Sequence, residues 1–125
     1  MVACASTAKA IDIGSPHGPV TAVGLECLDS ISEAGGLIHL SFLTRDRLEA
    51  FGVDQYIREN RAITARVAYF VSRNPHIPIL TTSSGAAAVF DGAELDLSAN
   101  PYAALKQEEE NLWRSSGEAR LAVVF

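Results

Sequence analysis

The longest helical pattern of this chain lies at residues 54–75, which read DQYIRENRAITARVAYFVSRNP. Its apolar residues recur at the three- and four-residue spacing of a single helix face. They are Tyr56, Ile63, Val67, Phe70 and Val71. Asp54 can cap the start, and Asn74-Pro75 ends the pattern because proline cannot continue a helix. The stretch predicts one long amphipathic helix, and the apolar stripe also includes the polar residue Asn60.

Two strand-like segments precede this helix. Residues 20–28 and 37–43 are rich in apolar and β-branched residues, and turn-forming residues separate them. This arrangement predicts an antiparallel hairpin. A short helix is expected at residues 45–51, because Thr44 can serve as its N-cap and Gly52 as its C-terminal stop.

Further strands follow the long helix. Residues 76–82 contain Ile-Pro-Ile, which is typical of an edge strand because Pro78 has no N–H to give to a ladder. Asp91-Gly92 predicts a tight hairpin turn between residues 86–90 and 93–97.

The C-terminal region predicts one helix and one strand. Asn100-Pro101 is typical of a helix start, and residues 118–125 alternate as a strand does. The apolar stripe of this helix is Tyr102, Leu105, Leu112 and Trp113. Its three consecutive carboxylates, Glu108–Glu110, fan around the helix axis, so we interpret them as solvating groups.

Strands and helices in this order lack the regular alternation of a doubly wound fold. We predict an α+β fold with a mainly antiparallel sheet. One long amphipathic helix, one short helix and one helix of the C-terminal region pack against it. The 125 residues suit a single domain over 1–125, with residues 1–10 as a flexible arm.

The cysteine content and the hydropathy indicate the cellular environment of the chain. Cys4 and Cys27 are the only cysteines, too few for a disulfide scaffold or a zinc site. We therefore expect free thiols, no metal and no cofactor. No apolar run reaches membrane-spanning length, so we expect no membrane segment and a cytoplasmic location.

Charge is distributed unevenly along the chain. The formal net charge is −5, but residues 44–74 carry +2 and residues 75–125 carry −4. Such polarity predicts a basic and an acidic face, which steer and orient a partner. The net negative charge argues against unspecific nucleic-acid binding by the whole surface.

Four arginines of the long helix form the candidate binding face: Arg58, Arg61, Arg66 and Arg73. At about 100° per residue, three of them share one flank that can grip phosphates or a carboxylate-rich protein surface. Binding to nucleic acid is one hypothesis for these arginines, and binding to an acidic protein surface is another. A simpler interpretation is favoured over both of these: the arginines form a solvated face with intramolecular pairs to Glu108–Glu110.

Four polar residues are candidates for a pocket between the sheet and the long helix: Asp12, His17, His39 and Asn60. Asn60 is the main cue, because a buried polar group needs a partner that a ligand can supply. Acid–base chemistry would require the fold to gather the histidines with carboxylates such as Asp12. His39 alternates with Ile38, Leu40 and Phe42, so we expect it to face solvent.

No catalytic motif stands out. The polar stretch at residues 81–85 lacks the lysine of a P-loop and the Gly-x-Ser-x-Gly of a serine hydrolase. We therefore predict a non-enzymatic, acidic interaction or assembly protein that binds a macromolecular partner or itself. We expect a structural subunit or an inhibitor of viral or mobile-element origin. The alternative is a small-molecule-binding domain or small enzyme that uses the pocket.

Overall fold

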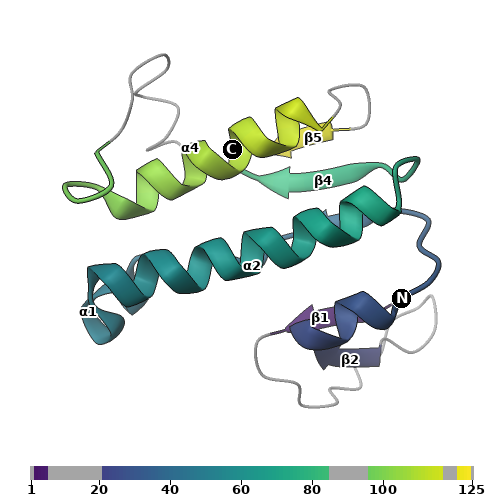
Figure 1. Cartoon of the computed structure of the whole chain (residues 1–125), viewed down its shortest axis with the longest axis horizontal. Helices are drawn as coiled ribbons and strands as arrows, with labels where there is room; N and C mark the ends of the chain where they lie inside the picture. Colours follow the sequence, from purple (N-terminus) through teal and green to yellow (C-terminus); the bar gives the residue numbers. More distant parts are fainter. Residues whose placement is uncertain (1, 6–20, 85–95, 117–120, 125) are drawn as a thin grey trace. The chain divides into compact units, whose positions relative to one another are not determined.

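A computed structural model of the chain describes residues 2–5, 21–84, 96–116 and 121–124 (Figure 1). The chain divides into two compact units, Met1–Glu33 and Ala34–Phe125. The single domain over 1–125 stays a prediction. Among the described residues, no helix combines the length and the apolar character needed to cross a membrane.

The N-terminal unit contains a small parallel sheet. Strand β1 (Val2–Ala5) pairs in parallel with strand β2 (Thr21–Gly24), and a 3-10 helix, η1 (Leu25–Ser30), follows. The strand predicted at residues 20–28 is therefore shorter than expected. Residues 2–5 of the predicted arm form a strand, and residues 6–10 lie outside the described residues.

The C-terminal unit contains a three-stranded sheet in the order β3-β4-β5. These strands are Leu37–His39, Ile79–Thr82 and Leu121–Val124, and both pairings are parallel. The prediction of an α+β fold with helices and a small sheet is confirmed. The antiparallel arrangement and the first hairpin are wrong, because β2 pairs with β1 and β3 pairs with β4. The hairpin predicted at residues 86–97 falls mainly on positions outside the described part.

Helical crossovers explain the parallel pairing. Parallel neighbours need a long connection that returns the chain to the same end of the sheet. Helices α1 (Asp46–Phe51) and α2 (Val53–Arg73) lie between β3 and β4 in sequence, and α4 (Pro101–Ser115) lies between β4 and β5. Since the strand order proceeds in one direction, right-handed crossovers place α2 and α4 on the same face of the sheet.

Strand β4 is central, whereas the sequence predicted an edge strand. Pro78 lies one residue before β4, so its missing N–H is not needed by the ladder. Its carbonyl instead accepts a hydrogen bond of 2.9 Å from the N–H of Leu37. Proline is therefore compatible with this position at the start of a central strand.

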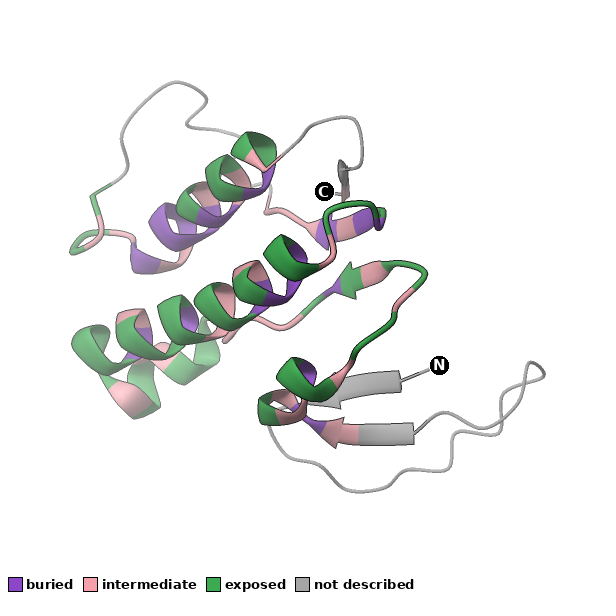
Figure 2. Cartoon of the chain, turned by 45° about the vertical axis from the view of Figure 1, so that its right-hand side comes forward, coloured by how far each residue is buried: buried purple, intermediate pink, exposed green. Residues whose placement is uncertain are grey.

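The long helix follows its sequence pattern. Helix α2 begins at Val53, directly after Gly52, and ends before Asn74. Its buried residues are Tyr56, Asn60, Val67, Phe70 and Val71, which confirms most of the predicted stripe. Figure 2 shows buried residues along one side of α2 and of α4. The start of α4 is also confirmed, since the Asn100 side chain accepts a hydrogen bond from the N–H of Ala103.

The side chains of strand β3 are oriented opposite to the prediction. His39 is buried, with 4% of its surface exposed, whereas Ile38 and Leu40 are 65% and 63% exposed. The alternation itself is as predicted, but the histidine faces the helices. The prediction that His39 faces solvent is wrong, because its ring forms a hydrogen bond with a buried carboxylate on α4.

We expect Gly52→Ala to lower the free energy of unfolding by about 1–3 kcal/mol. Gly52 connects α1 to α2 with φ 74° and ψ 162°, a conformation that an L side chain strains to adopt. Urea denaturation measures the loss. Gly35→Ala is the matched control, because its added methyl group meets no atom within 4 Å and φ there is not positive. A similar loss in both variants would contradict this explanation.

Candidate functional site

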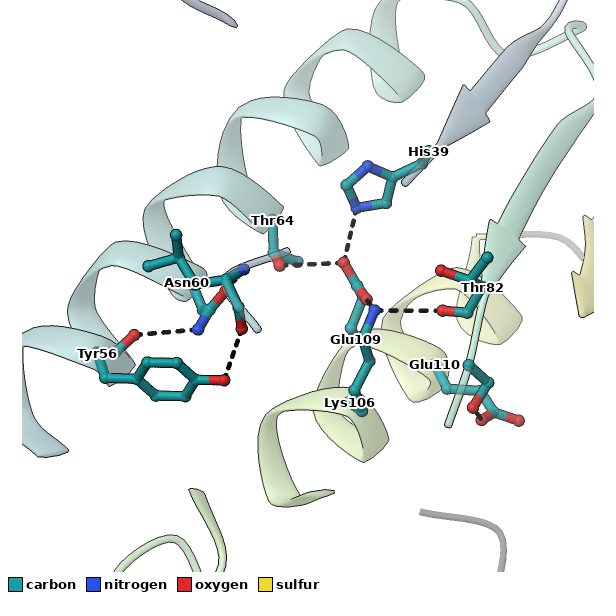
Figure 3. A network of polar contacts seen from close by, with 10 residues as sticks. His39, Tyr56, Asn60, Thr64, Thr82, Lys106, Glu109 and Glu110 are labelled. Atoms are coloured by element: carbon teal, nitrogen blue, oxygen red, sulfur yellow. Dashed lines mark hydrogen bonds and ion pairs between the residues drawn. The ribbon is translucent and has the colours of Figure 1, made fainter. Parts of the chain in front are cut away.

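A buried carboxylate joins three elements of the C-terminal unit. Glu109 of α4 is 2% exposed, and its Oε1 lies 2.7 Å from Nε2 of His39 on β3. The same oxygen accepts a hydrogen bond of 3.3 Å from the hydroxyl of Thr64 on α2. Figure 3 shows these side chains converging on one point. Helices α2 and α4 therefore both meet the face of the sheet that carries His39.

Lys106 completes this buried ion cluster of His39, Lys106 and Glu109. Its Nζ lies 2.9 Å from Oε2 of Glu109, three residues further along α4 (Figure 3). The same ammonium donates to the carbonyl of Thr82 at 3.2 Å and lies 4.0 Å from the centroid of the Phe42 ring. Lys106 is only 5% exposed, so these partners take the place of water around its ammonium group.

The cluster lies at the carboxyl ends of two strands. His39 is the last residue of β3, and Thr82 is the last residue of β4. In open parallel sheets, ligands bind beyond such ends at the point where the strand order reverses. The order β3-β4-β5 contains no reversal, so the position of the cluster in the sheet does not by itself indicate a ligand site.

The electrostatics of the cluster favour an ionised Glu109. Burial disfavours the charged carboxylate and would raise its pKa. The hydrogen bond from His39, the charge that His39 carries when it is protonated, and the charge of Lys106 outweigh that effect and hold the pKa of Glu109 below its usual value. An ionised carboxylate only accepts hydrogen bonds, so the Nε2 atom of His39 is the donor.

Two buried polar atoms beside His39 have no hydrogen-bond partner. Among the described residues, the buried side-chain atoms without one are Oγ1 of Thr81 and Nε1 of Trp113. Thr81 is the register partner of His39 across β3 and β4. The Trp113 ring contacts the His39 ring edge-on, with centroids 5.7 Å apart. Unsatisfied buried groups are uncommon in folded proteins, so we take the region around His39 as the candidate site.

A cleft of about 320 Å³ opens between α2 and α4 beside the cluster. Its polar lining includes Asn60 and Thr64 from α2 and Glu109 from α4, and an exposed pair, Arg61 and Glu108, also borders it. The apolar lining consists of Phe42, Ala65, Leu105 and Leu112. Asn60 is the predicted pocket residue that appears in this lining. The cleft lies between two helices, and the pocket predicted between the sheet and the long helix stays a prediction.

Asn60 is buried as predicted, with 1% of its surface exposed, but its amide bonds mainly to backbone. Its Oδ1 accepts from the N–H of Leu43 at 2.7 Å, and its Nδ2 donates to the carbonyl of Tyr56 at 3.2 Å. The Tyr56 hydroxyl donates to the carbonyl of Leu43 at 2.6 Å. Asn60 and Tyr56 therefore hold the segment after β3 against α2, and Asn60 needs no ligand to satisfy it.

The other predicted pocket residues are not brought together by the described structure. Asp12 and His17 lie outside the described residues. His39 contacts Glu109 and is not among the residues that line the cleft. Within the described ranges, no group of three or more His, Cys, Asp or Glu residues could hold a metal ion.

The helix arginines are exposed, and Arg61 forms an ion pair within the chain. Arg61 contacts both carboxylate oxygens of Glu108 on α4, at 2.7 and 3.1 Å. This pair matches the solvated face with intramolecular pairs that the sequence favoured. Arg73 lies over the ring of Tyr69, 5.7 Å from its centroid. Arg58 and Arg66 are exposed, and nucleic-acid binding through this face stays a prediction.

The sequence reasoning missed Thr64, Lys106 and Glu109. The interpretation of Glu108–Glu110 as solvating groups is wrong for Glu109, which is buried. One signal was present in the spacing. Glu109 lies four residues after Leu105 and four before Trp113, which places it in the apolar stripe of α4.

Comparisons with known proteins give no further assignment. No protein-family model matches the chain, and no curated protein or solved structure is significantly similar to it. The function must therefore be inferred from the geometry.

We expect Asn60→Ala to reduce the free energy of unfolding by about 2–3 kcal/mol. The substitution leaves the N–H of Leu43 and the carbonyl of Tyr56 without this partner. Equilibrium denaturation in urea gives the value. Gln55→Ala, at an exposed position of the same helix, should change it by no more than about 0.5 kcal/mol. Equal losses of unfolding free energy in both variants would mean that the hydrogen bonds of the Asn60 amide do not stabilise the fold.

Glu109→Gln should lower the free energy of unfolding by about 3 kcal/mol at neutral pH, since Lys106 loses its buried counter-charge. The pKa of Glu109 is lowered in the folded state, so its ionisation stabilises the fold above the unfolded glutamate pKa of about 4.3. That contribution disappears as the pH falls through the folded pKa. The difference between wild type and variant should therefore narrow as the pH falls below the unfolded glutamate pKa.

Urea unfolding of both proteins across this pH range checks the expectation, because other carboxylates cancel in the difference. Glu108→Gln is the control, and its exposed pair with Arg61 should contribute no more than about 1 kcal/mol. A difference between wild type and Glu109→Gln that does not depend on pH would show that Glu109 is not an ionised partner of the cluster.

Proposed function

We propose that this chain is a non-enzymatic interaction or assembly protein that binds a second copy of itself or another protein through its sheet. The surface involved is the face of the sheet that carries Ile38 of β3, together with Leu40, the residue directly after that strand, here termed the open sheet face. The observation that supports the proposal is the exposure of these two side chains, 65% and 63%.

Parallel sheets provide the physical reason. Their strands are usually covered on both faces, because the crossover helices and the strands bury apolar side chains on each side. Helices α2 and α4 meet the face that contains His39. Adjacent exposed side chains of leucine and isoleucine on the other face favour a partner surface over water.

The edges of the sheet provide a second route for association. Strand β3 pairs with β4 on one side and is an edge of the three-stranded sheet. Edge strands have backbone N–H and C=O groups that can pair with a strand of another chain. An apolar face next to an available edge suits a protein interface better than a nucleic-acid interface, which needs dense positive charge.

The charge distribution is consistent with this proposal. The net charge of −5 disfavours unspecific nucleic-acid binding by the whole surface. The exposed arginines of α2 lie on the helix-covered side of the sheet, so they are not part of the proposed interface.

We expect the wild-type protein to form a discrete oligomer, and Ile38→Lys or Leu40→Lys to convert it to a monomer. A buried lysine at an apolar interface has no partner for its charge, so association should weaken at least about tenfold. Size-exclusion chromatography with multi-angle light scattering measures the mass. Tyr69→Lys is the matched control, because Tyr69 is also exposed but lies on α2.

A wild-type monomer would contradict self-assembly and leave a different protein as the partner. A photo-crosslinking residue at position 38, used in the native cells, then gives the decisive result. A specific protein adduct that is lost with Leu40→Lys and kept with Tyr69→Lys would support the proposal. Monomeric protein without such an adduct would contradict it.

A further inference from the structure

We infer that the cleft between α2 and α4 binds a small, neutral and mainly apolar molecule that carries one O–H or N–H donor. Glu109 and Thr64 would accept that donor at the polar end of the cleft. This inference concerns the helix-covered side of the sheet and does not depend on the proposed interaction through the open sheet face.

The size and walls of the cleft suit a small apolar body. Its volume of about 320 Å³ is at the lower end of the range for ligand sites. Four of its lining residues are apolar: Phe42, Ala65, Leu105 and Leu112. A ring or a short branched chain would exchange water for contacts with these side chains.

The polar end of the cleft has unused acceptor capacity. An ionised carboxylate has about four acceptor positions. Described residues use three positions on Glu109, through the bonds from His39, Thr64 and Lys106. The Thr64 hydroxyl donates its proton to Glu109, so its oxygen can still accept a hydrogen bond. Thr64 and Glu109 are both among the residues that line the cleft. The Glu109 side chain is 2% exposed, so a ligand has to reach inward between α2 and α4 for its donor to meet either acceptor.

The charges select a neutral donor. The negative charge of Glu109 is already balanced by Lys106, whose Nζ is 2.9 Å away. A ligand cation at the same carboxylate would be repelled by that ammonium, and an anion would be repelled by Glu109. At the exposed side of the cleft, Arg61 and Glu108 neutralise each other. An alcohol, a phenol or an amide N–H therefore fits better than an amine or a carboxylic acid.

Benzyl alcohol is a suitable probe, because it joins an apolar ring to one hydroxyl donor. Its matched control is benzyl methyl ether, which keeps the ring and lacks the donor. Titration of ¹⁵N-labelled protein, followed by amide chemical shifts, should show saturable changes around Thr64, Leu105 and Leu112. We expect the alcohol to bind about three- to tenfold more tightly than the ether, the contribution of one hydrogen bond.

Three variants locate the site and its chemistry. Ala65→Phe places a ring in the cleft and should abolish the saturable shifts. Ala62→Phe is its control, since Ala62 is exposed on the same helix and does not line the cleft. Thr64→Val keeps the shape of the side chain but removes the hydroxyl, so it should reduce the preference for the alcohol.

Each outcome decides part of the inference. No saturable shift with benzyl alcohol, or shifts that persist in Ala65→Phe, would overturn the site. Equal affinity for alcohol and ether would overturn the recognition of a donor. Because Ile38→Lys and Leu40→Lys change the other face of the sheet, they should leave alcohol binding unchanged, so failure of the interaction proposal is distinguishable from failure here.

Discussion

The hydrogen bond between His39 and Glu109 determines which way the first strand of the three-stranded sheet faces. Side chains of a strand alternate between its two faces, so burial of His39 places Ile38 on the other face, and Leu40, directly after the strand, is exposed as well. One pairing of 2.7 Å therefore links two features of the protein. On one face it assembles a buried ion cluster beside a cleft, and on the opposite face it exposes the apolar surface that we propose as an interface.

The buried charges contribute more to selecting one packing of the helices on the sheet than to the stability of the fold. Removing an ion pair from water costs free energy that good geometry only partly offsets, and apolar residues often stabilise a core as well. Glu109 offsets the cost through three bonds, to β3, to α2 and to Lys106 on its own helix. Lys106 in turn bonds to the end of β4. We infer that the cluster fixes the positions of α2 and α4 on the sheet, because an apolar core would accept several similar packings.

Local signals in the sequence predicted local structure well. The apolar spacing of α2, the stop at Gly52 and the Asn100-Pro101 start of α4 depend on neighbours within one or two helical turns. Strand pairing depends on residues far apart in the chain, so the parallel order was not predicted. From hydrophobicity alone we expected Ile38 to be buried and His39 to be exposed. The opposite orientation depends on the partner of His39, which lies 70 residues away on α4 and could not be identified from neighbouring residues. Glu109 was missed for the same reason, and Asn60 was placed correctly because burial follows from helical spacing alone.

The most direct test of this account is the state of the His39 ring in solution, observed by long-range ¹H–¹⁵N correlation and assigned with a His39→Gln variant. We predict a proton on Nε2 that exchanges slowly with solvent, since it is buried and bonded to a carboxylate. The exposed His76 provides an internal reference for rapid exchange. A His39 ring that exchanges as rapidly as His76, or that carries its proton only on Nδ1, would contradict the inward orientation on which the cluster, the cleft and the open sheet face depend.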